Sequence, residues 1–255
     1  IVIKNNKNMG LVYSLNKAIS IAQGEYIARM DADDCARKNR LQLQYDYIRK
    51  KKADFLISNI DYFYEEQYVE GEKFPALNNK QIVYLMKKGN VSIHPTWFYK
   101  KIIHECIGGY RDIKYCEDVD YILRVIQKGF NCYKMSEHLL IYRIRESGIS
   151  KVNALEQYYN ATFLRKKYAA GEKVQDIIPQ SLDRIASTFS GKEKEQYAQA
   201  DRMMSEFVRQ LGKKQYVKCF SNALQGILSN RYYRKLFVRN VNYRLSVLKV
   251  LYLTD

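Results

Sequence analysis

Two groups of carboxylates in this sequence have the residue types and spacing that could support chemistry. The first is Asp31-Ala32-Asp33-Asp34, which follows the small and apolar run 26–30. The second is the adjacent pair Glu117-Asp118. Carboxylates at the end of a strand suit Mg²⁺ or Mn²⁺, which also binds substrate phosphates. A carboxylate beside a reacting hydroxyl can accept its proton.

Both groups also have an ordinary structural interpretation. Asp33 or Asp34 could cap a helix predicted at residues 37–50, because a carboxylate accepts hydrogen bonds from the first N–H groups of a helix. Glu117 and Asp118 could stabilise the first turn of a following helix through its dipole. Spacing alone leaves the chemical and the capping interpretations open.

The elements predicted around the first group alternate between strand and helix. Apolar spacing predicts strands at residues 1–4, 26–30 and 55–60, and helices at residues 11–22 and 37–50. This alternation is typical of an α/β fold with a mostly parallel sheet flanked by helices. Ligands of such sheets bind at the carboxyl ends of the strands, which is where the acidic group at 31–34 is expected.

The remainder of the chain is predicted to be mainly helical and more basic. Residues 151–255 carry 19 Lys and Arg against 9 Asp and Glu, in a chain of net charge +16. We therefore expect a boundary near residue 150, with an α/β domain at 1–150 and a helical region at 151–255. The basic stretch 206–255 could lie on an anionic membrane, or it could pack on the first domain with its charges in water.

The cysteines and apolar runs restrict the cellular setting. Five cysteines without a Cys-x-x-Cys pair argue against a disulfide framework and a structural zinc site. No apolar run reaches the roughly 18 residues that a membrane span needs. These features favour a cytoplasmic location, either free or at the inner face of the membrane.

Several short motifs resemble, in the same order, those of the family 2 glycosyltransferases. They are Asn8-Met9-Gly10-Leu11, Leu15-Asn16-Lys17-Ala18, Gly24-Glu25-Tyr26-Ile27, the acidic group at 31–34, Ser58-Asn59, Ile93-His94-Pro95-Thr96, Gly108-Gly109-Tyr110-Arg111, Glu117-Asp118-Val119-Asp120-Tyr121 and Tyr142-Arg143. The resemblance covers residues 1–150 and implies a GT-A-like fold. It also implies inverting transfer of a sugar from a nucleotide-diphosphate donor, most commonly a UDP-sugar, to a saccharide or lipid-linked acceptor. The family's first βαβ portion is expected to precede residue 1.

The resemblance also implies a role for each matching residue. Asp33 would bind the metal, and Asp31 would contact the metal or the ribose of the donor. Asp118 would be the general base that deprotonates the acceptor hydroxyl, with Glu117 beside it at the donor. Asp120 is expected to be structural.

Four further residues are expected near the donor. Gly10 would let the backbone approach the nucleotide, although a plain turn glycine is the alternative. Asn16 could reach the donor or could simply be a polar residue on a helix surface, and His94 could line the site or be structural. Arg145 stands where many relatives have a His, so it would bind diphosphate oxygens rather than the metal. The lone Trp97 is expected to be buried in the sheet.

Three other functions compete with this interpretation. A haloacid-dehalogenase-like phosphatase also places Asp-x-Asp after a strand, but that strand should open the domain. A non-enzymatic nucleic-acid binder would use the positive charge, yet no zinc-finger or RNP-like motif supports it, so no nucleic acid is expected as a partner. The third is a catalytically incomplete transferase that serves as a scaffold.

Overall fold

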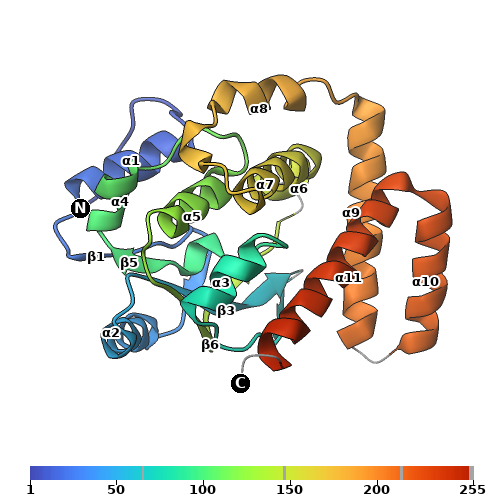
Figure 1. The fold of residues 1–255 in the computed structure, drawn as a ribbon, viewed down its shortest axis with the longest axis horizontal. Helices are drawn as coiled ribbons and strands as arrows, with labels where there is room; N and C mark the ends of the chain where they lie inside the picture. The colour runs from blue at the N-terminus through green and yellow to red at the C-terminus, as the bar shows by residue number, and fades with distance from the viewer. Residues whose placement is uncertain (65, 146–147, 213–214, 253–255) are drawn as a thin grey trace.

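The computed structural model describes residues 1–64, 66–145, 148–212 and 215–252 (Figure 1). Its strands are β1 Tyr26–Ala28, β2 Cys35–Ala36, β3 Phe55–Tyr64, β4 Gln67–Val69, β5 Phe98–Lys100 and β6 Cys132–Arg143. Its helices in the first part of the chain are α1 Leu11–Ile21, α2 Arg40–Lys51, α3 Asn79–Met86, α4 Ile102–Ile107 and α5 Glu117–Gln127. The later ones are α6 Ile149–Val152, α7 Ala154–Ala169, α8 Pro179–Ala186, α9 Gly191–Gly212, α10 Tyr216–Ser229 and α11 Arg231–Tyr252. Short 3-10 turns lie at His94–Thr96 and Val174–Asp176.

The sheet has the strand order β1-β5-β3-β6-β2, and β4 pairs with the far end of β3. Only β3 and β6 pair in parallel among the described strands. Because β1 and β3 both lie antiparallel to β5, they run in the same direction as β6. Their carboxyl ends therefore meet at one edge of the sheet.

The α/β class is confirmed, but the sheet is mixed rather than mostly parallel. The short strands β5 and β2 run opposite to their neighbours. Apolar spacing reports which residues are buried in a strand and does not report the direction in which a connection brings the strand into the sheet. Apolar spacing therefore could not predict how many pairs of neighbouring strands run in parallel.

The strand predicted at residues 1–4 is wrong. These residues have no regular structure, and Ile1 and Val2 are almost completely exposed. An extended segment is stable in a sheet only when a neighbour pairs with its N–H and C=O groups. No strand in the described ranges pairs with this segment.

Alternating strand residues divide the apolar core between the two faces of the sheet. Phe55, Ile57 and Trp97 pack with α3, α4, α5 and α7 on one face. Leu56 and Phe98 pack against α2 on the other face. Trp97 is fully buried, as predicted, and its Nε1 donates to Ser92 Oγ at 2.8 Å.

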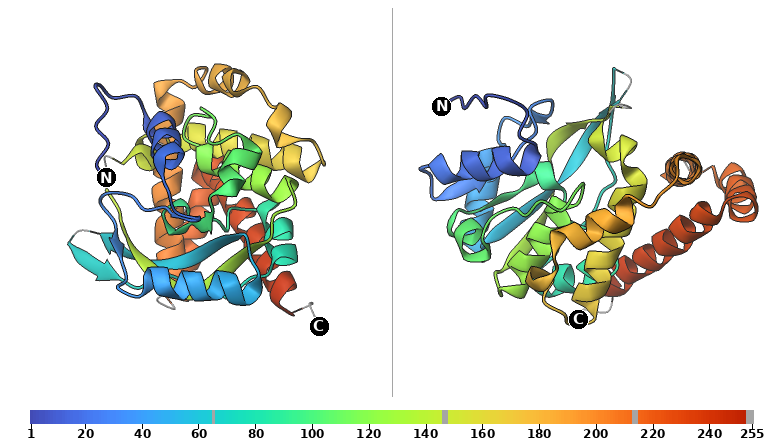
Figure 2. Two further views of the ribbon diagram at one scale, coloured as in Figure 1. Left: turned by 90° about the vertical axis from the view of Figure 1, so that its left-hand side faces the viewer. Right: turned by 90° about the horizontal axis from the view of Figure 1, so that it is seen from above.

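The helical region contributes to two apolar cores, the main core of the sheet domain and a separate core of its own. From α7, Ala161, Leu164 and Tyr168 join the main core, so the packing runs across the boundary predicted near residue 150. A second core joins the start of α7 to α9 and α11. Figures 1 and 2 show α9, α10 and α11 as a bundle at one side of the sheet domain. Within the described ranges, no helix is both long and apolar enough to cross a membrane.

Candidate active site

The acidic group crosses the edge of the sheet where the strands end. Just after β1, the N–H of Arg29 donates to the carbonyl of Trp97 at 2.9 Å. At the other end of the segment, Asp34 Oδ1 accepts the N–H of Arg143, the last residue of β6, at 3.0 Å. The sequence prediction that this group lies at the carboxyl ends of strands is therefore confirmed.

An arginine or backbone group contacts each carboxylate of the group. Both oxygens of Asp31 accept hydrogen bonds from Arg29, at 2.6 and 2.8 Å. Asp33 forms an ion pair with Arg145 Nε at 3.1 Å. Burial raises the pKa of Asp34 to about 6, and its Oδ2 is buried without a hydrogen-bond partner in the described chain.

The capping interpretation of these aspartates does not hold. The residue that caps α2 is Asn39, and no side chain accepts a hydrogen bond from the N–H groups of its first turn. Asp33 and Asp34 instead face β6 through Arg143, whose Nε donates to the carbonyl of Asp33 at 3.1 Å. These two aspartates therefore interact with the end of β6 rather than with the start of α2.

The loop fits a cation that takes most of its ligands from a bound diphosphate. The described residues contain no cluster of three or more His, Cys, Asp or Glu side chains that could hold a metal alone. Mg²⁺ commonly binds through one or two carboxylates together with substrate phosphates. Asp33 is partly exposed, and among the described residues its carboxylate pairs with the exposed Arg145. The next residue, Asp34, has a buried Oδ2 without a hydrogen-bond partner in the described chain.

The second carboxylate pair lies at the N-terminus of α5. Burial raises the pKa of Glu117 to about 7, with a further contribution from Asp118. Burial also raises the pKa of Asp118, and the two largest of several favourable interactions that oppose this rise come from Val119 and Arg29. One is the N–H of Val119, which donates to Asp118 Oδ1 at 2.7 Å, and the other is the charge of Arg29.

His94 belongs to a buried aromatic cluster behind these carboxylates. Its Nε2 lies 2.8 Å from the hydroxyl of Tyr110, and its ring packs against Trp97 at 4.4 Å between centroids. Burial, followed by the charge of Arg29, holds its pKa well below the usual value. His94 is therefore a neutral ring that supports the site rather than a cationic ligand.

Asn16 joins α1 to the turn before the second carboxylate pair. Its Nδ2 donates to the carbonyl of Tyr110, and its Oδ1 accepts the N–H of Tyr110, both at 2.9 Å. The neighbouring Gly109 has φ +74°, and a side chain there would lie 2.9 Å from Asn16 Oδ1. Asn16 therefore has a structural role, because its amide joins α1 to the turn at Tyr110.

Gly10 forms the turn that opens α1. Its φ of +82° falls in the region that favours glycine, and its N–H donates to Asn8 Oδ1 at 3.0 Å. No atom lies within 4 Å of the position where a side chain would start. The open space at this turn is compatible with close approach of a ligand to the backbone.

The sequence and the geometry agree with a known family. Residues 1–108 match the family described as glycosyl transferase family 2. Residues 1–108 of this chain belong to glycosyltransferase family 2.

Several curated relatives of this chain are named as glycosyltransferases of bacteria or archaea. It is 31% identical over 162 residues to an uncharacterized glycosyltransferase of Methanocaldococcus jannaschii, covering 62% of this chain and 56% of that one. It is 30% identical over 171 residues to the O-antigen biosynthesis glycosyltransferase WbnJ of Escherichia coli, covering 66% of each. A further E. coli relative, UDP-Gal:alpha-D-GlcNAc-diphosphoundecaprenol beta-1,3-galactosyltransferase, is 26% identical over 70% of this chain and 66% of its own. The chain thus spans little more than half the length of the first relative.

The remaining carboxylate of the second motif is structural in this glycosyltransferase, as predicted. Asp120 is completely buried and contacts the guanidinium groups of Arg111 and Arg124. Arg124 also donates to the carbonyls of Ile107 and Gly109, at 2.6 and 2.8 Å. This network fixes the turn at 107–111 against α5.

The sequence interpretation missed the central cation of the site. Arg29 is buried, binds Asp31, and places its charge within electrostatic range of Glu117, Asp118 and His94. Its position before the acidic group was the only signal in the sequence. Arg143 was noted only as part of a motif, yet it contacts both Asp33 and Asp34.

Proposed function

We propose that this chain transfers a sugar from a nucleotide-diphosphate sugar to an acceptor hydroxyl with inversion at the anomeric carbon. One relationship carries the proposal: Arg29 binds Asp31 and also acts electrostatically on Asp118. This shared interaction supports placing the acidic loop and the second carboxylate pair, which lie far apart in sequence, in one site. Such a site has one part for a leaving diphosphate and another for an incoming hydroxyl.

The loop at 31–34 would hold the diphosphate of the donor. Asp33 would bind Mg²⁺ or Mn²⁺ with help from Asp34, and the ion would neutralise charge on the departing diphosphate. Arg145 would exchange its ion pair with Asp33 for the diphosphate oxygens, since its guanidinium matches their geometry. Asp31, held by Arg29, would accept a hydrogen bond from the ribose or contact the ion.

Asp118 would act as the general base. It accepts the proton of the acceptor hydroxyl while that oxygen attacks the anomeric carbon and the bond to the diphosphate breaks. A base must be ionised to do so, and burial opposes ionisation of Asp118. The N–H of Val119 and the charge of Arg29 offset that burial and support the proposed role.

The relatives support a donor and acceptor class. One relative is named for a UDP-galactose donor, and another for O-antigen biosynthesis. We therefore propose a UDP-sugar donor and a saccharide or lipid-linked acceptor, within surface polysaccharide synthesis. Membership of family 2 disfavours the phosphatase and nucleic-acid alternatives.

The test is a donor screen with the purified protein. UDP-sugars would be offered with Mn²⁺ or Mg²⁺, and both binding and transfer would be followed. Asp118→Asn should bind the donor normally and lose transfer, whereas the matched change Asp112→Asn, at an exposed neighbour, should retain both. Full transfer by Asp118→Asn would refute the base, and donor binding without transfer by the wild type would favour the scaffold.

A location at the cytoplasmic face of a membrane remains part of the proposal. Large apolar side chains of α10 are exposed at four-residue intervals, namely Tyr216, Phe220, Leu224 and Leu228. An exposed apolar stripe of this kind can enter the interfacial layer of a bilayer. Sedimentation with anionic vesicles tests it, and Leu224→Ser combined with Leu228→Ser should weaken any binding.

A further inference from the structure

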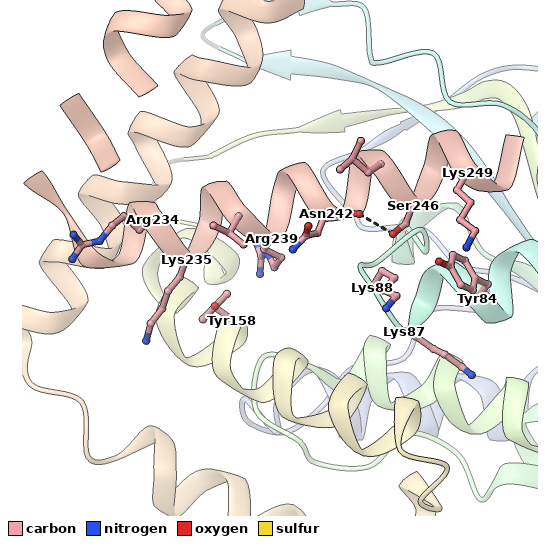
Figure 3. Close-up of a pocket in the computed structure, with 12 residues that line it drawn as sticks. Tyr84, Lys87, Lys88, Tyr158, Arg234, Lys235, Arg239, Asn242, Ser246 and Lys249 are labelled. Atoms are coloured by element: carbon pink, nitrogen blue, oxygen red, sulfur yellow. Dashed lines mark hydrogen bonds between the residues drawn. The ribbon is translucent and has the colours of Figure 1, made fainter. Parts of the chain in front are cut away.

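A second ligand-sized feature lies away from the acidic loop, between α11, α7 and the end of α3 (Figure 3). This groove has a volume of about 930 Å³. Six of its lining side chains are cationic: Lys87, Lys88, Arg234, Lys235, Arg239 and Lys249. No lining residue is a carboxylate. We call these six side chains and the space between them the basic groove.

The cations of the basic groove are not neutralised by the protein. None of the six forms an ion pair within the described part of the chain. Three of the six, Lys87, Lys235 and Arg239, lie over aromatic rings instead. Arg239 lies 4.8 Å from the ring centre of Tyr158, and Lys87 lies 5.9 Å from that of Tyr168. Like charges gathered without counter-ions repel one another, and an anionic ligand would relieve that repulsion.

The groove also offers surfaces for the neutral part of a ligand. Val238 and Leu245 of α11 are more than half exposed, and both line the groove. Tyr84 and Tyr158 line it from α3 and α7, and Figure 3 shows both rings on the side opposite α11. A recess between helices admits a chain-like molecule, whereas a flat bilayer would contact protruding surfaces. Phosphate groups joined to sugars match this combination of cations and rings.

Arg165 of α7 interacts electrostatically with a residue of the basic groove and with a residue of the proposed active site. It lies two helical turns after Tyr158 and so shares its face of α7. Arg165 exposes only 7% of its surface, yet its guanidinium forms no hydrogen bond or ion pair with any described residue. Its charge interacts with both Arg239 and Asp118. On the same face, Thr162 has a buried hydroxyl without a partner in the described chain.

We propose that the basic groove binds the acceptor through phosphate groups that the acceptor carries. Arg239 and Arg165 hold the phosphate nearest to the hydroxyl that Asp118 deprotonates, and the lysines bind the phosphates farther along the chain. This assignment rests on the proposed function, because it is the transferase mechanism that gives Asp118 an acceptor.

Direct binding tests the groove without requiring the true acceptor. The probe is short-chain inorganic polyphosphate, measured by calorimetry at low salt with the purified protein. Lys87→Gln with Lys88→Gln should weaken binding roughly tenfold. The matched control is Lys50→Gln with Lys51→Gln, another adjacent and exposed lysine pair, on α2, and it should leave binding nearly unchanged.

The arginines require a second pair of variants because Arg165 is buried. Arg239→Gln and the conservative Arg165→Lys should each weaken polyphosphate binding and leave binding of UDP-sugar with Mn²⁺ unchanged. Equal losses in the groove and control lysine variants would overturn the proposal, since binding would then follow net charge alone. Loss of anionic-vesicle binding in the groove variants, with polyphosphate binding intact, would overturn it in favour of a membrane surface.

The donor measurement separates this proposal from the function on which it rests. Loss of UDP-sugar binding together with polyphosphate binding in the groove variants would overturn the acceptor assignment, because the groove would then serve the donor. A wild-type protein that binds polyphosphate through the groove but binds no nucleotide-sugar would contradict the proposed function and, with it, the acceptor role.

Discussion

Both carboxylate oxygens of Asp31 accept hydrogen bonds from the guanidinium of Arg29, two residues earlier in the chain. The side chain of Arg29 is only 6% exposed, while that of Asp31 is about one third exposed. Planar pairing at two points fixes the guanidinium in one place. Its charge therefore acts from a fixed position on the carboxylates of α5.

Arg29→Gln should shift the pH dependence of transfer. Arg29 lowers the pKa of Asp118, so its loss should raise that pKa and leave the base protonated at higher pH. The acidic limb of the rate profile should move upward by roughly one pH unit. Arg49→Gln, at an exposed position on α2, is the control. An unchanged profile in Arg29→Gln would separate Arg29 from the base.

Arg145→Ala should have opposite effects on metal and donor. Without a donor, Arg145 pairs with Asp33 and competes with a cation for that carboxylate. Its removal should strengthen Mn²⁺ binding to the free protein but weaken UDP-sugar binding about tenfold, through the lost charge-assisted bonds. Manganese titration and donor calorimetry measure the two effects. If both affinities fell together, Arg145 would instead be stabilising the loop.

Asp120→Asn should destabilise the fold without directly touching the site. The change leaves Arg111 and Arg124 without their buried carboxylate. Breaking such a network typically costs about 3 kcal/mol of unfolding free energy. Urea denaturation should show this loss, while Asp112→Asn, at an exposed residue nearby, should stay within about 0.5 kcal/mol of the wild type. Equal stability of the two variants would contradict a structural role for Asp120.

Glu117→Gln should change how stability depends on pH. The pKa of Glu117 is about 7 in the folded chain, above its usual value. Between roughly pH 4.5 and 7 the unfolded chain releases this proton while the folded chain keeps it, so rising pH favours unfolding of the wild type. Gln has no such proton to release.

Relative to the variant, the wild type should therefore lose about 3 kcal/mol of unfolding free energy between pH 4.5 and pH 8. Urea denaturation at the two pH values measures the difference. Burial lowers the pKa of His94 in the folded chain, so titration of His94 makes stability rise with pH. His94 is present in both proteins, and its contribution cancels when the two are compared. A constant difference across this range would mean that Glu117 is ionised in the folded chain.

Local pattern was sufficient for most elements of the fold. The helical spacing at 11–22 became α1 at Leu11–Ile21, and the apolar run at 55–60 became the first part of β3. It failed for residues 1–4, where a strand also needs a partner. Strand direction and the continuation of the core across residue 150 depend on long-range packing, which periodicity does not record.

The sequence by itself determined the family and which carboxylates to consider, because motif order and residue type are local properties. Only the tertiary structure decided which partners these groups have. It joined Asp31 to Arg29, Asp33 to Arg145, and Asn16 to Tyr110, and it gathered the lysines that follow α3 and the cations of α11 into one groove. Contacts of this kind depend on distances between residues far apart in sequence, and burial then sets the pKa of each group that they enclose.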